Sequence, residues 1–148
     1  MPSLLANPRH RAARPAGPLI HLAILHARYI DAILLGDKTI ESRLSRTRRA
    51  PFGIVRKGDL IFFKESGGPV RARARVKRAL FFDNLVEAEV ARLRDRYNAD
   101  IGGDDAYWHA KRDARFASLI WLASAAPLPA ADAINVPASN GHAWFVGV

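Results

Sequence analysis

The first periodic stretch of the chain predicts a strand followed by a short helix. Before residue 19 the hydrophobic and polar positions show no period. Residues 19–25 are almost continuously apolar, which predicts a buried strand whose one face carries Ile20, Leu22 and Ile24. Between about residues 28 and 35 apolar side chains recur at helical spacing, and Gly36 suits the position just past a helix end.

Residues 38–43 and the two runs that follow predict three more strands. In 38–43, strand geometry places Ile40 on one face and three polar residues on the other, namely Thr39, Glu41 and Arg43. Residues 60–64 and 70–76 flank a Ser-Gly-Gly-Pro turn and together predict a hairpin. The second run alternates regularly, and its polar face carries Arg71, Arg73 and Arg75.

Helical patterns cluster late in the chain. Asp83 or Asn84 can cap a helix that runs to about Tyr97, with four apolar residues inward: Leu85, Val86, Val90 and Leu93. After the Gly102-Gly103 loop, Asp104 or Asp105 can cap a short second helix. Residues 116–122 and 143–148 predict two closing strands, and the Pro-containing stretch 125–141 predicts a loop.

This order of elements predicts an α+β fold. We expect a mixed sheet of five or six strands, curled into a partial β-barrel, with flanking helices. At 148 residues the chain is the size of one domain, so we assign residues 19–148 to it. Residues 1–18, which are rich in Ala, Pro and Arg, are expected to form a flexible basic tail that folding does not require.

Composition narrows the classes of protein that remain. The absence of cysteine excludes disulfides, thiolate metal sites and cysteine nucleophiles, and it suits the reducing cytoplasm, where we expect this protein. No apolar run approaches the roughly 18 residues that a membrane span needs, so we expect no membrane association. The five histidines lack metal-ligand spacing, and we predict neither a metal site nor a cofactor.

The net charge of +9 is concentrated in one segment. Residues 41–78 hold twelve Lys and Arg against three acids, whereas residues 79–148 hold six against nine. A basic face of this kind attracts polyanions, so we expect this segment, with its arginines at 71, 73 and 75, to dominate affinity for RNA. The alternative is a solvated surface without a partner.

Three polar clusters could carry chemistry, and each also has a structural interpretation. The group at 39–43 is either a ligand site or a solvated Glu–Arg pair on a sheet face. The stretch Lys64, Glu65, Ser66 and Gly67 is either an anion-binding turn or an ordinary hairpin turn. Trp108 and Lys111, one helical turn apart, could stack on a base and hold a phosphate, or Trp108 could pack the helix onto the sheet.

Gly-Asp-Lys-Thr-Ile-Glu-Ser-Arg at 36–43 resembles the signature of the ASCH domain family, a Gly followed by Lys-Thr-x-Glu-x-Arg. The Gly58-Asp59 turn and the closing Ala143-Trp144 are similar to further family landmarks. The stretches 64–68 and 107–116 resemble landmarks of one bacterial and archaeal branch. The resemblance extends over about residues 20–148 and implies a PUA-like β-barrel with a cleft between barrel and helices.

The resemblance also implies what the cleft could do. Related domains bind RNA or modified nucleic acids there, some small ASCH proteins hydrolyse the acetyl amide of acetylated cytidine, and one branch is associated with ribonuclease activity. Lys38 matches the Lys of the acetylcytidine hydrolases. The residue three positions further on is Glu41 in this chain, where those hydrolases have Thr.

We therefore expect a domain that binds RNA or a modified nucleotide in a cationic cleft. The resemblance places Lys38, Glu41 and Arg43 in the cleft, residues 64–66 on a neighbouring strand end, and Trp108 and Lys111 on the opposite wall. One alternative is a metal-independent hydrolase of a modified nucleoside or of RNA, in which Lys38 is base or nucleophile and Glu41 orients it or moves a proton. A protein-interaction domain with an incidental basic face is the other alternative.

Overall fold

The computed structural model describes residue 14, residues 16–129 and residues 143–147. Within them the elements follow in the order β1 (Ile20–Leu25), α1 (Ala27–Leu35), β2 (Ile40–Ser45), β3 (Leu60–Glu65), β4 (Val70–Phe82), α2 (Glu87–Ile101), α3 (Asp105–Lys111), β5 (Phe116–Pro127) and β6 (Trp144–Val146). None of the helices in this part of the chain is long and apolar enough to cross a membrane. The prediction of an α+β fold with five or six strands is confirmed, since six strands form.

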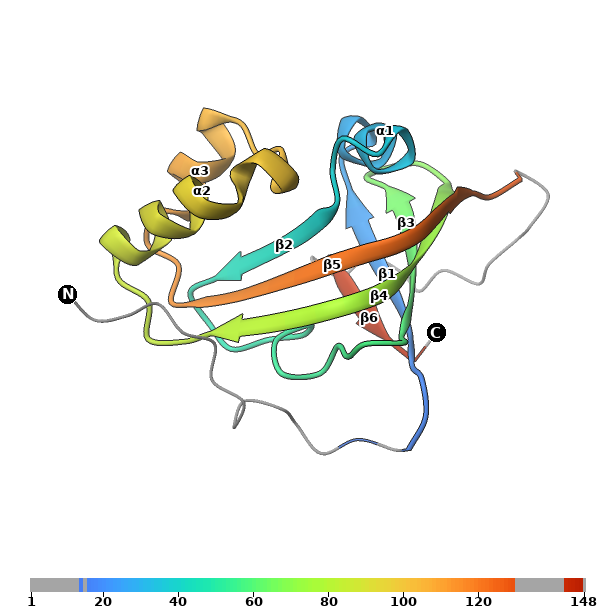
Figure 1. Ribbon diagram of the computed structural model, residues 1–148, viewed down its shortest axis with the longest axis horizontal. Coiled ribbons are helices and arrows are strands. Elements are labelled where there is room, and N and C mark those ends of the chain that lie inside the picture. Colours follow the sequence, from blue (N-terminus) through green and yellow to red (C-terminus); the bar gives the residue numbers. More distant parts are fainter. Residues whose placement is uncertain (1–13, 15, 130–142, 148) are drawn as a thin grey trace.

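The strands form one mixed, strongly curled sheet. Their order is β2-β5-β4-β3-β1-β6, with β1 and β3 parallel and the other neighbours antiparallel. In Figure 1, β2, β5 and β4 run along the length of the molecule, and β1, β3 and β6 stand across them. This curl makes a half-barrel, with α2 and α3 beside β2 and with α1 at the far ends of β1 and β3 (Figure 1).

Local sequence patterns account for several of these elements. The apolar stripe of α1 buries Ile30 and Ile33, and Gly36 ends the helix with φ 86°, a left-handed conformation that glycine adopts without strain. In β4 the predicted alternation is confirmed, because Ala72 and Ala74 are buried and Arg73 is exposed. The hairpin of β3 and β4 also forms as predicted.

Two predicted details are wrong. Ile20 of β1 is 39% exposed, whereas His21 and Ala23 on the other face are fully buried. Since β1 lies between β3 and β6 and is covered on both faces, its near-continuous apolar run does not show which face is inward. The helix predicted to begin after Asp83 or Asn84 begins at Glu87, and Val86, predicted to be inward, is its exposed N-cap residue.

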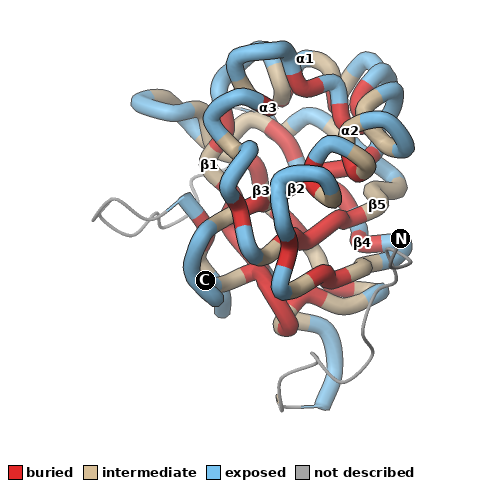
Figure 2. The backbone as a smooth tube through the Cα atoms, turned by 90° about the vertical axis from the view of Figure 1, so that its left-hand side faces the viewer, coloured by how far each residue is buried: buried red, intermediate tan, exposed pale blue. Residues whose placement is uncertain are grey.

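The sheet packs apolar side chains on both of its faces. Alternate residues of β5 point to opposite sides, so Ile120 belongs to one buried cluster and Leu119 to the other. The first cluster lies inside the curl, with Phe63 and α1 residues such as Ile33, and the second lies beneath α2 and α3, with Leu93. Figure 2 shows the buried residues following the strands, with exposed residues on the outer turns of the helices.

A buried polar network closes the end of the half-barrel near β1 and β3. Asp59 is fully buried and receives hydrogen bonds from Arg14 at 2.6 Å to each carboxylate oxygen, from His21 Nε2 at 2.8 Å, and from the backbone N–H groups of Leu19 and Arg56. Arg14 belongs to the segment expected to be a dispensable tail, and its contact departs from that expectation. Residues 1–13 and 15 of the predicted tail lie outside the described residues.

These contacts set the ionisation of both buried groups. Burial alone would raise the pKa of Asp59, but hydrogen bonds from Arg14, His21 and two backbone N–H groups hold that pKa well below its usual range. Burial lowers the pKa of His21 more than Asp59 raises it, so the ring is neutral at pH 7. Asp59 thus stays a carboxylate in the folded protein at pH values where an unfolded chain would protonate it.

We predict that Arg14→Ala lowers the free energy of unfolding by about 1–3 kcal/mol, because a buried carboxylate loses charged donors. Asp59 has a depressed pKa in the folded state, so its stabilisation is complete above the unfolded pKa of about 4 and is lost as the pH falls through the folded value. The difference between wild type and variant should therefore be largest near neutral pH and shrink in acid. Urea unfolding at several pH values measures it.

Arg28→Ala is the matched control, since Arg28 forms an exposed ion pair with Asp104 whose removal should change stability little. If Arg14→Ala and Arg28→Ala unfolded at the same urea concentration, the buried contact would contribute nothing.

Candidate functional site

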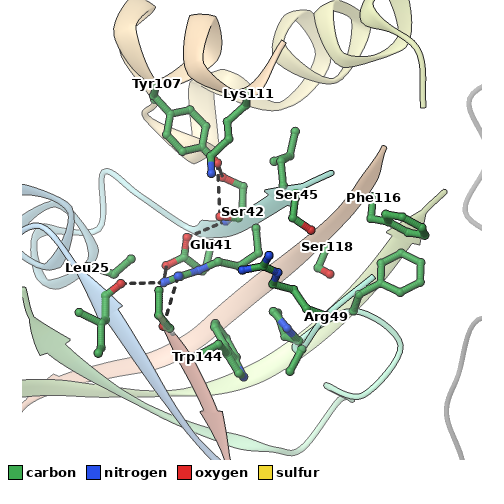
Figure 3. Close-up of a pocket in the computed structure, with 18 of the residues that line it drawn as sticks. Leu25, Glu41, Ser42, Ser45, Arg49, Tyr107, Lys111, Phe116, Ser118 and Trp144 are labelled. Carbon is green, nitrogen blue, oxygen red and sulfur yellow. Dashed lines mark hydrogen bonds and ion pairs between the residues drawn. The ribbon is translucent and has the colours of Figure 1, made fainter. Parts of the chain in front are cut away.

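A pocket of about 940 Å³ opens on the concave side of the sheet, between α1, β2, α3 and the end of β6. Its lining is drawn from segments that are far apart in the sequence, and an aromatic residue and a cation lie on each side of it. In Figure 3, Tyr107 and Lys111 point from α3 toward Ser42, while Trp144 and Arg49 lie on the opposite side. The main polar and aromatic lining residues are Tyr29, Lys38, Glu41, Ser42, Arg43, Ser45, Arg46, Arg49, Phe52, Ser66, Tyr107, Lys111, Phe116, Ser118 and Trp144.

Lys38 lies at the floor of this pocket with only 3% of its side chain exposed. Its Nζ donates to the carbonyl oxygen of Ile40 at 2.8 Å and to that of Ile101 at 2.7 Å. Burial lowers the pKa of Lys38, Glu41 raises it, and Arg43 lowers it further, and the net shift is downward. A lysine in this environment loses its proton more readily than a lysine on the surface.

Glu41 is the acidic partner of this lysine and is equally buried. Its Oε1 accepts the backbone N–H of Ser42 at 2.7 Å and lies 3.8 Å from Lys38 Nζ. Its Oε2 lies 3.5 Å from Arg43 but has no hydrogen bond, although it is inaccessible to bulk solvent. A buried carboxylate oxygen without a hydrogen bond is costly, so this oxygen is an open acceptor at the pocket floor.

Arg43 joins this floor to the aromatic wall. It donates to the carbonyl oxygen of Ile24 at 3.1 Å and to that of Ala143 at 3.3 Å. Its guanidinium carbon also lies 5.2 Å from the centre of the Trp144 ring, a cation–π distance. The side of β2 that was predicted to carry Glu41 and Arg43 therefore lies toward the pocket.

A second wall is made of hydroxyl and aromatic groups. The Tyr107 hydroxyl lies 2.7 Å from Ser42 Oγ, and the Tyr107 ring meets Tyr29 edge-on at 6.4 Å. Burial raises the pKa of Tyr107, so its hydroxyl is neutral and able to donate. Burial, together with Arg43 and Arg49, lowers the pKa of Lys111 beside it.

The structure brings together only part of the predicted site. Lys38, Glu41, Arg43, Ser66 and Lys111 all line the pocket. The remaining candidates do not line it: Thr39, Lys64, Glu65, Gly67, Trp108, Arg71, Arg73 and Arg75.

The candidates outside the pocket have structural contacts or lie on another face. Thr39 is exposed, and Lys64 donates to the carbonyl oxygen of Glu65. Arg71 pairs with Asp31 at 2.7 Å and with Glu65 at 3.0 Å. Gly67 lies in the β3–β4 turn, and the two exposed arginines of β4 point away from the inner face that carries Ala72, Ala74 and Val76.

Trp108 packs the short helix instead of facing the pocket. It is 4% exposed, belongs to the cluster beneath α2 and α3, and donates its indole N–H to Asn98 at 2.9 Å. The prediction that it walls the cleft is wrong, and the packing alternative is right. At the same end of the helix, Tyr107 takes the place in the pocket that Trp108 was expected to fill.

Sequence reasoning missed ten of the lining residues named above: Tyr29, Ser42, Ser45, Arg46, Arg49, Phe52, Tyr107, Phe116, Ser118 and Trp144. Ser42 lies between Glu41 and Arg43, and Tyr107 precedes Trp108, so the sequence pattern indicated the right segments. It did not show which side chain of each segment faces the pocket. Ser118 pairs across strands with Arg43, and this contact between residues far apart in sequence leaves no local signal. Among the described residues, no three His, Asp or Glu side chains group closely enough to hold a metal ion.

The buried network of Asp59 reaches the pocket through one histidine. Trp144 donates its indole N–H to His21 Nδ1 at 3.1 Å, and His21 Nε2 bonds to Asp59. A ring that accepts at Nδ1 must carry its proton on Nε2, which it then donates to Asp59. His21 is therefore held in one tautomer and fixes the position of Trp144 in the pocket wall.

Comparisons with known proteins identify the fold. No family model matches the sequence, and no curated protein matches it. The crystal structure of ASCH from Zymomonas mobilis superposes with a TM-score of 0.57 at 20% identity, covering 73% of this chain and 69% of that chain. A tyrosine-to-phenylalanine mutant of that protein gives a TM-score of 0.58 at 20% identity, covering 73% of this chain and 71% of the mutant. The chain therefore has the ASCH-domain fold, which confirms the fold expected from the resemblance.

We predict that two near-isosteric substitutions of His21 separate its two hydrogen bonds. His21→Asn keeps an acceptor oxygen where Nδ1 lies, so Trp144 retains its bond and Asp59 loses one. His21→Gln keeps a donor N–H where Nε2 lies, so the reverse holds. Each should cost about 1–3 kcal/mol of stability, but only His21→Gln should free the Trp144 indole N–H.

Exchange of the indole N–H with water, followed by NMR, measures this difference. The chain has three tryptophans, so Trp144→Phe assigns the resonance. Equal exchange rates for the Trp144 indole in the two variants would show that His21 does not hold the ring.

Proposed function

We propose that this domain binds one nucleotide of an RNA chain in the pocket, with the base at the floor and the phosphate near the rim. The observation that carries the proposal is the Lys38–Glu41 pair, which is buried at the bottom of an open pocket with one carboxylate oxygen unbonded. A pocket of about 940 Å³ falls within the size range of small-molecule sites and admits a nucleotide.

The floor offers the groups that a nucleobase edge needs. Glu41 Oε2 can accept a ring or amino N–H, and the neutral hydroxyls of Tyr107 and Ser42 can donate or accept. The rings of Tyr29 and Trp144 line the same pocket, and a base stacked on an aromatic side chain gains about 1–3 kcal/mol. Polar groups below and aromatic walls beside them suit a flat heterocycle.

The rim offers cations for a phosphate. Arg46 is neutralised by an exposed ion pair with Asp113, but Arg49 and Lys111 form no ion pair within the described residues. The lowered pKa of Lys111 shows that it lies among like charges and partly out of water. A bound phosphate would relieve this repulsion.

A purely structural role explains the buried pair poorly. A buried ion pair stabilises a protein only when its geometry is good and its remaining polar atoms are bonded. The 3.8 Å separation and the unbonded Oε2 do not meet this condition. Groups held in such an arrangement are more typical of a functional site than of a structural one.

We predict that the double variant Lys38→Met/Glu41→Gln folds and melts moderately below the wild type. Removal of both buried charges together offsets part of the cost of leaving the carbonyls of Ile40 and Ile101 without their donor. The affinity of the variant for nucleotides should fall at least about tenfold, which corresponds to about 1.4 kcal/mol. Calorimetric titration with the four ribonucleoside monophosphates and a short RNA, paired with melting curves, measures both effects.

Asp37→Asn is the control, since this exposed carboxylate precedes Lys38 and does not line the pocket. If the double variant bound nucleotides like the wild type, the pocket floor would not be the base-binding site. A loss of folding together with binding would identify the pair as structural.

The state of Lys38 favours a second candidate function, a metal-independent hydrolase. Two N–H bonds of its amine point to carbonyl oxygens, so a deprotonated Lys38 would have its lone pair free for a substrate. Acting as base, it would take a proton from water that attacks the amide of a modified nucleoside, or from the 2′-hydroxyl that attacks an RNA phosphodiester. Glu41 would hold the resulting ammonium, which would return the proton to the leaving nitrogen or 5′-oxygen as the C–N or P–O bond breaks.

For this hydrolase we predict that the rate rises with pH as Lys38 loses its proton. Since Glu41 raises the pKa of Lys38, Glu41→Gln should shift the rise to lower pH. Arg43 lowers that pKa, so Arg43→Gln should shift the rise to higher pH. Profiles of kcat/KM against pH for acetylated cytidine and single-stranded RNA measure the shifts, and movement of both variants in one direction would exclude Lys38 as the titrating group.

A further inference from the structure

A second, smaller hollow of about 230 Å³ lies on the protein surface between the segment before β3 and the middle of β4. Four of its eight lining residues are cations and none is an acid: Arg56, Lys57, Lys77 and Arg78 around Val55, Ala79, Leu80 and Phe81. The other four lining residues are apolar, so the only charges that this lining carries are positive. This lining suits a single anionic group.

Three cations of this hollow have no carboxylate beside them. Lys57, Lys77 and Arg78 are exposed and form no ion pair within the described part of the chain. Arg28, Arg46 and Arg94 instead pair with Asp104, Asp113 and Asp105, whereas Arg73 and Arg75, further along β4, are exposed and also form no ion pair there. Uncompensated like charges gathered in one place repel each other, and an anion would remove that repulsion.

Arg78 adds a direct aromatic feature to the same surface. Its guanidinium carbon lies 4.9 Å from the centre of the Trp121 ring, and Trp121 meets Tyr97 edge-on at 5.7 Å. Stacking on the ring limits the directions that the guanidinium can take, so less freedom is lost when it binds an anion. Arg78 thus belongs to the lining of the hollow while its guanidinium is held against Trp121, which lies outside that lining.

One short segment connects the hollow to the large pocket. Residues 46, 47 and 49–52 line the pocket, and residues 55–57 line the hollow. Phe52 lies between the two sites, with its ring centre 5.2 Å from that of Phe116 in the pocket and 5.4 Å from that of Phe81 in the hollow. Arg48, exposed and 5.0 Å from the Phe52 ring, lies along this path. The two sites are therefore neighbours, within the reach of a few linked nucleotides.

We infer that the hollow binds a backbone phosphate of the RNA chain whose base occupies the pocket. The inference rests on the proposed function and makes it more specific, because it assigns a polymer and not a free nucleotide as the ligand. A mononucleotide fills the pocket alone, whereas a longer chain also places a phosphate over Lys57, Lys77 and Arg78. Affinity should then increase with chain length until the hollow is reached.

The test compares two double variants of β4 that remove equal charge. Lys77→Gln/Arg78→Gln changes the hollow, and Arg73→Gln/Arg75→Gln changes the exposed face further along the same strand. Binding of uridine monophosphate and of oligouridylates of about two to eight nucleotides is titrated at several salt concentrations. Melting curves verify that both variants fold.

We expect the wild type to bind oligouridylate more tightly than the mononucleotide. The hollow variant should lose about tenfold or more of this gain and keep its mononucleotide affinity, and its dependence on log salt should become shallower by about 0.7 per lost phosphate contact. The Arg73/Arg75 variant should lose much less. An inorganic polyphosphate should compete weakly, since it has no base to enter the pocket.

Three results would overturn the inference. An equal loss in both variants would support the sequence-based expectation that the outer arginines dominate, with charge acting without a defined site. Binding that does not depend on chain length would show that the hollow does not contact the RNA, and the proposal that the pocket binds a nucleotide would still hold. Absence of binding to both mononucleotide and oligonucleotide would overturn the proposed function itself.

Discussion

The arrangement of this domain follows from the burial of one ammonium group. Lys38 can lie beneath the pocket only because its Nζ donates to backbone carbonyls of β2 and of the end of α2 and faces Glu41. These bonds fix the turn after α1 to the last residue of α2, and the backbone N–H of Thr39 adds a bond to the Asp100 carbonyl. The helices are thereby held at the distance from the sheet that keeps the pocket open.

Buried polar groups form a continuous series from one end of the half-barrel to the pocket floor. Arg14 binds Asp59, Asp59 fixes His21, and His21 holds Trp144. The Trp144 ring makes a cation–π contact with Arg43, which forms an ion pair with Glu41. Within this series the buried side-chain atoms without a hydrogen bond are Arg14 Nε and Glu41 Oε2, and the unmet acceptor belongs to a residue that lines the pocket.

The charge of the chain has two different uses in the folded molecule. Many basic residues of segment 41–78 are used internally, as Arg43 is in the pocket wall and Arg71 is with Asp31 and Glu65. Of those that form no ion pair within the described residues, Arg49 lines the pocket and Lys57, Lys77 and Arg78 line the hollow beside β4, whereas Arg73 and Arg75 lie on the exposed face of that strand. A ligand that carries both a flat base and linked phosphates would match this distribution better than one that carries either feature alone.

Local periodicity was sufficient to predict α1 with its glycine end, the alternating β4 strand, the α+β class, and the shared strand face of Glu41 and Arg43, because each depends on residues close together in the chain. The position of Lys38 beside them was expected only from the family resemblance. Tyr107 and Trp108 are adjacent on one helix, and their helical spacing does not show which of them is buried. Tertiary contacts determine that Trp108 packs into the cluster beneath α2 and α3 and that Tyr107 lines the pocket. Ser118, Trp144 and Arg14 reach their partners across long sequence separations, through strand pairing and curl. Sequence patterns encode which face of an element is apolar, whereas the meeting of two distant faces is fixed only when the whole sheet closes around its core.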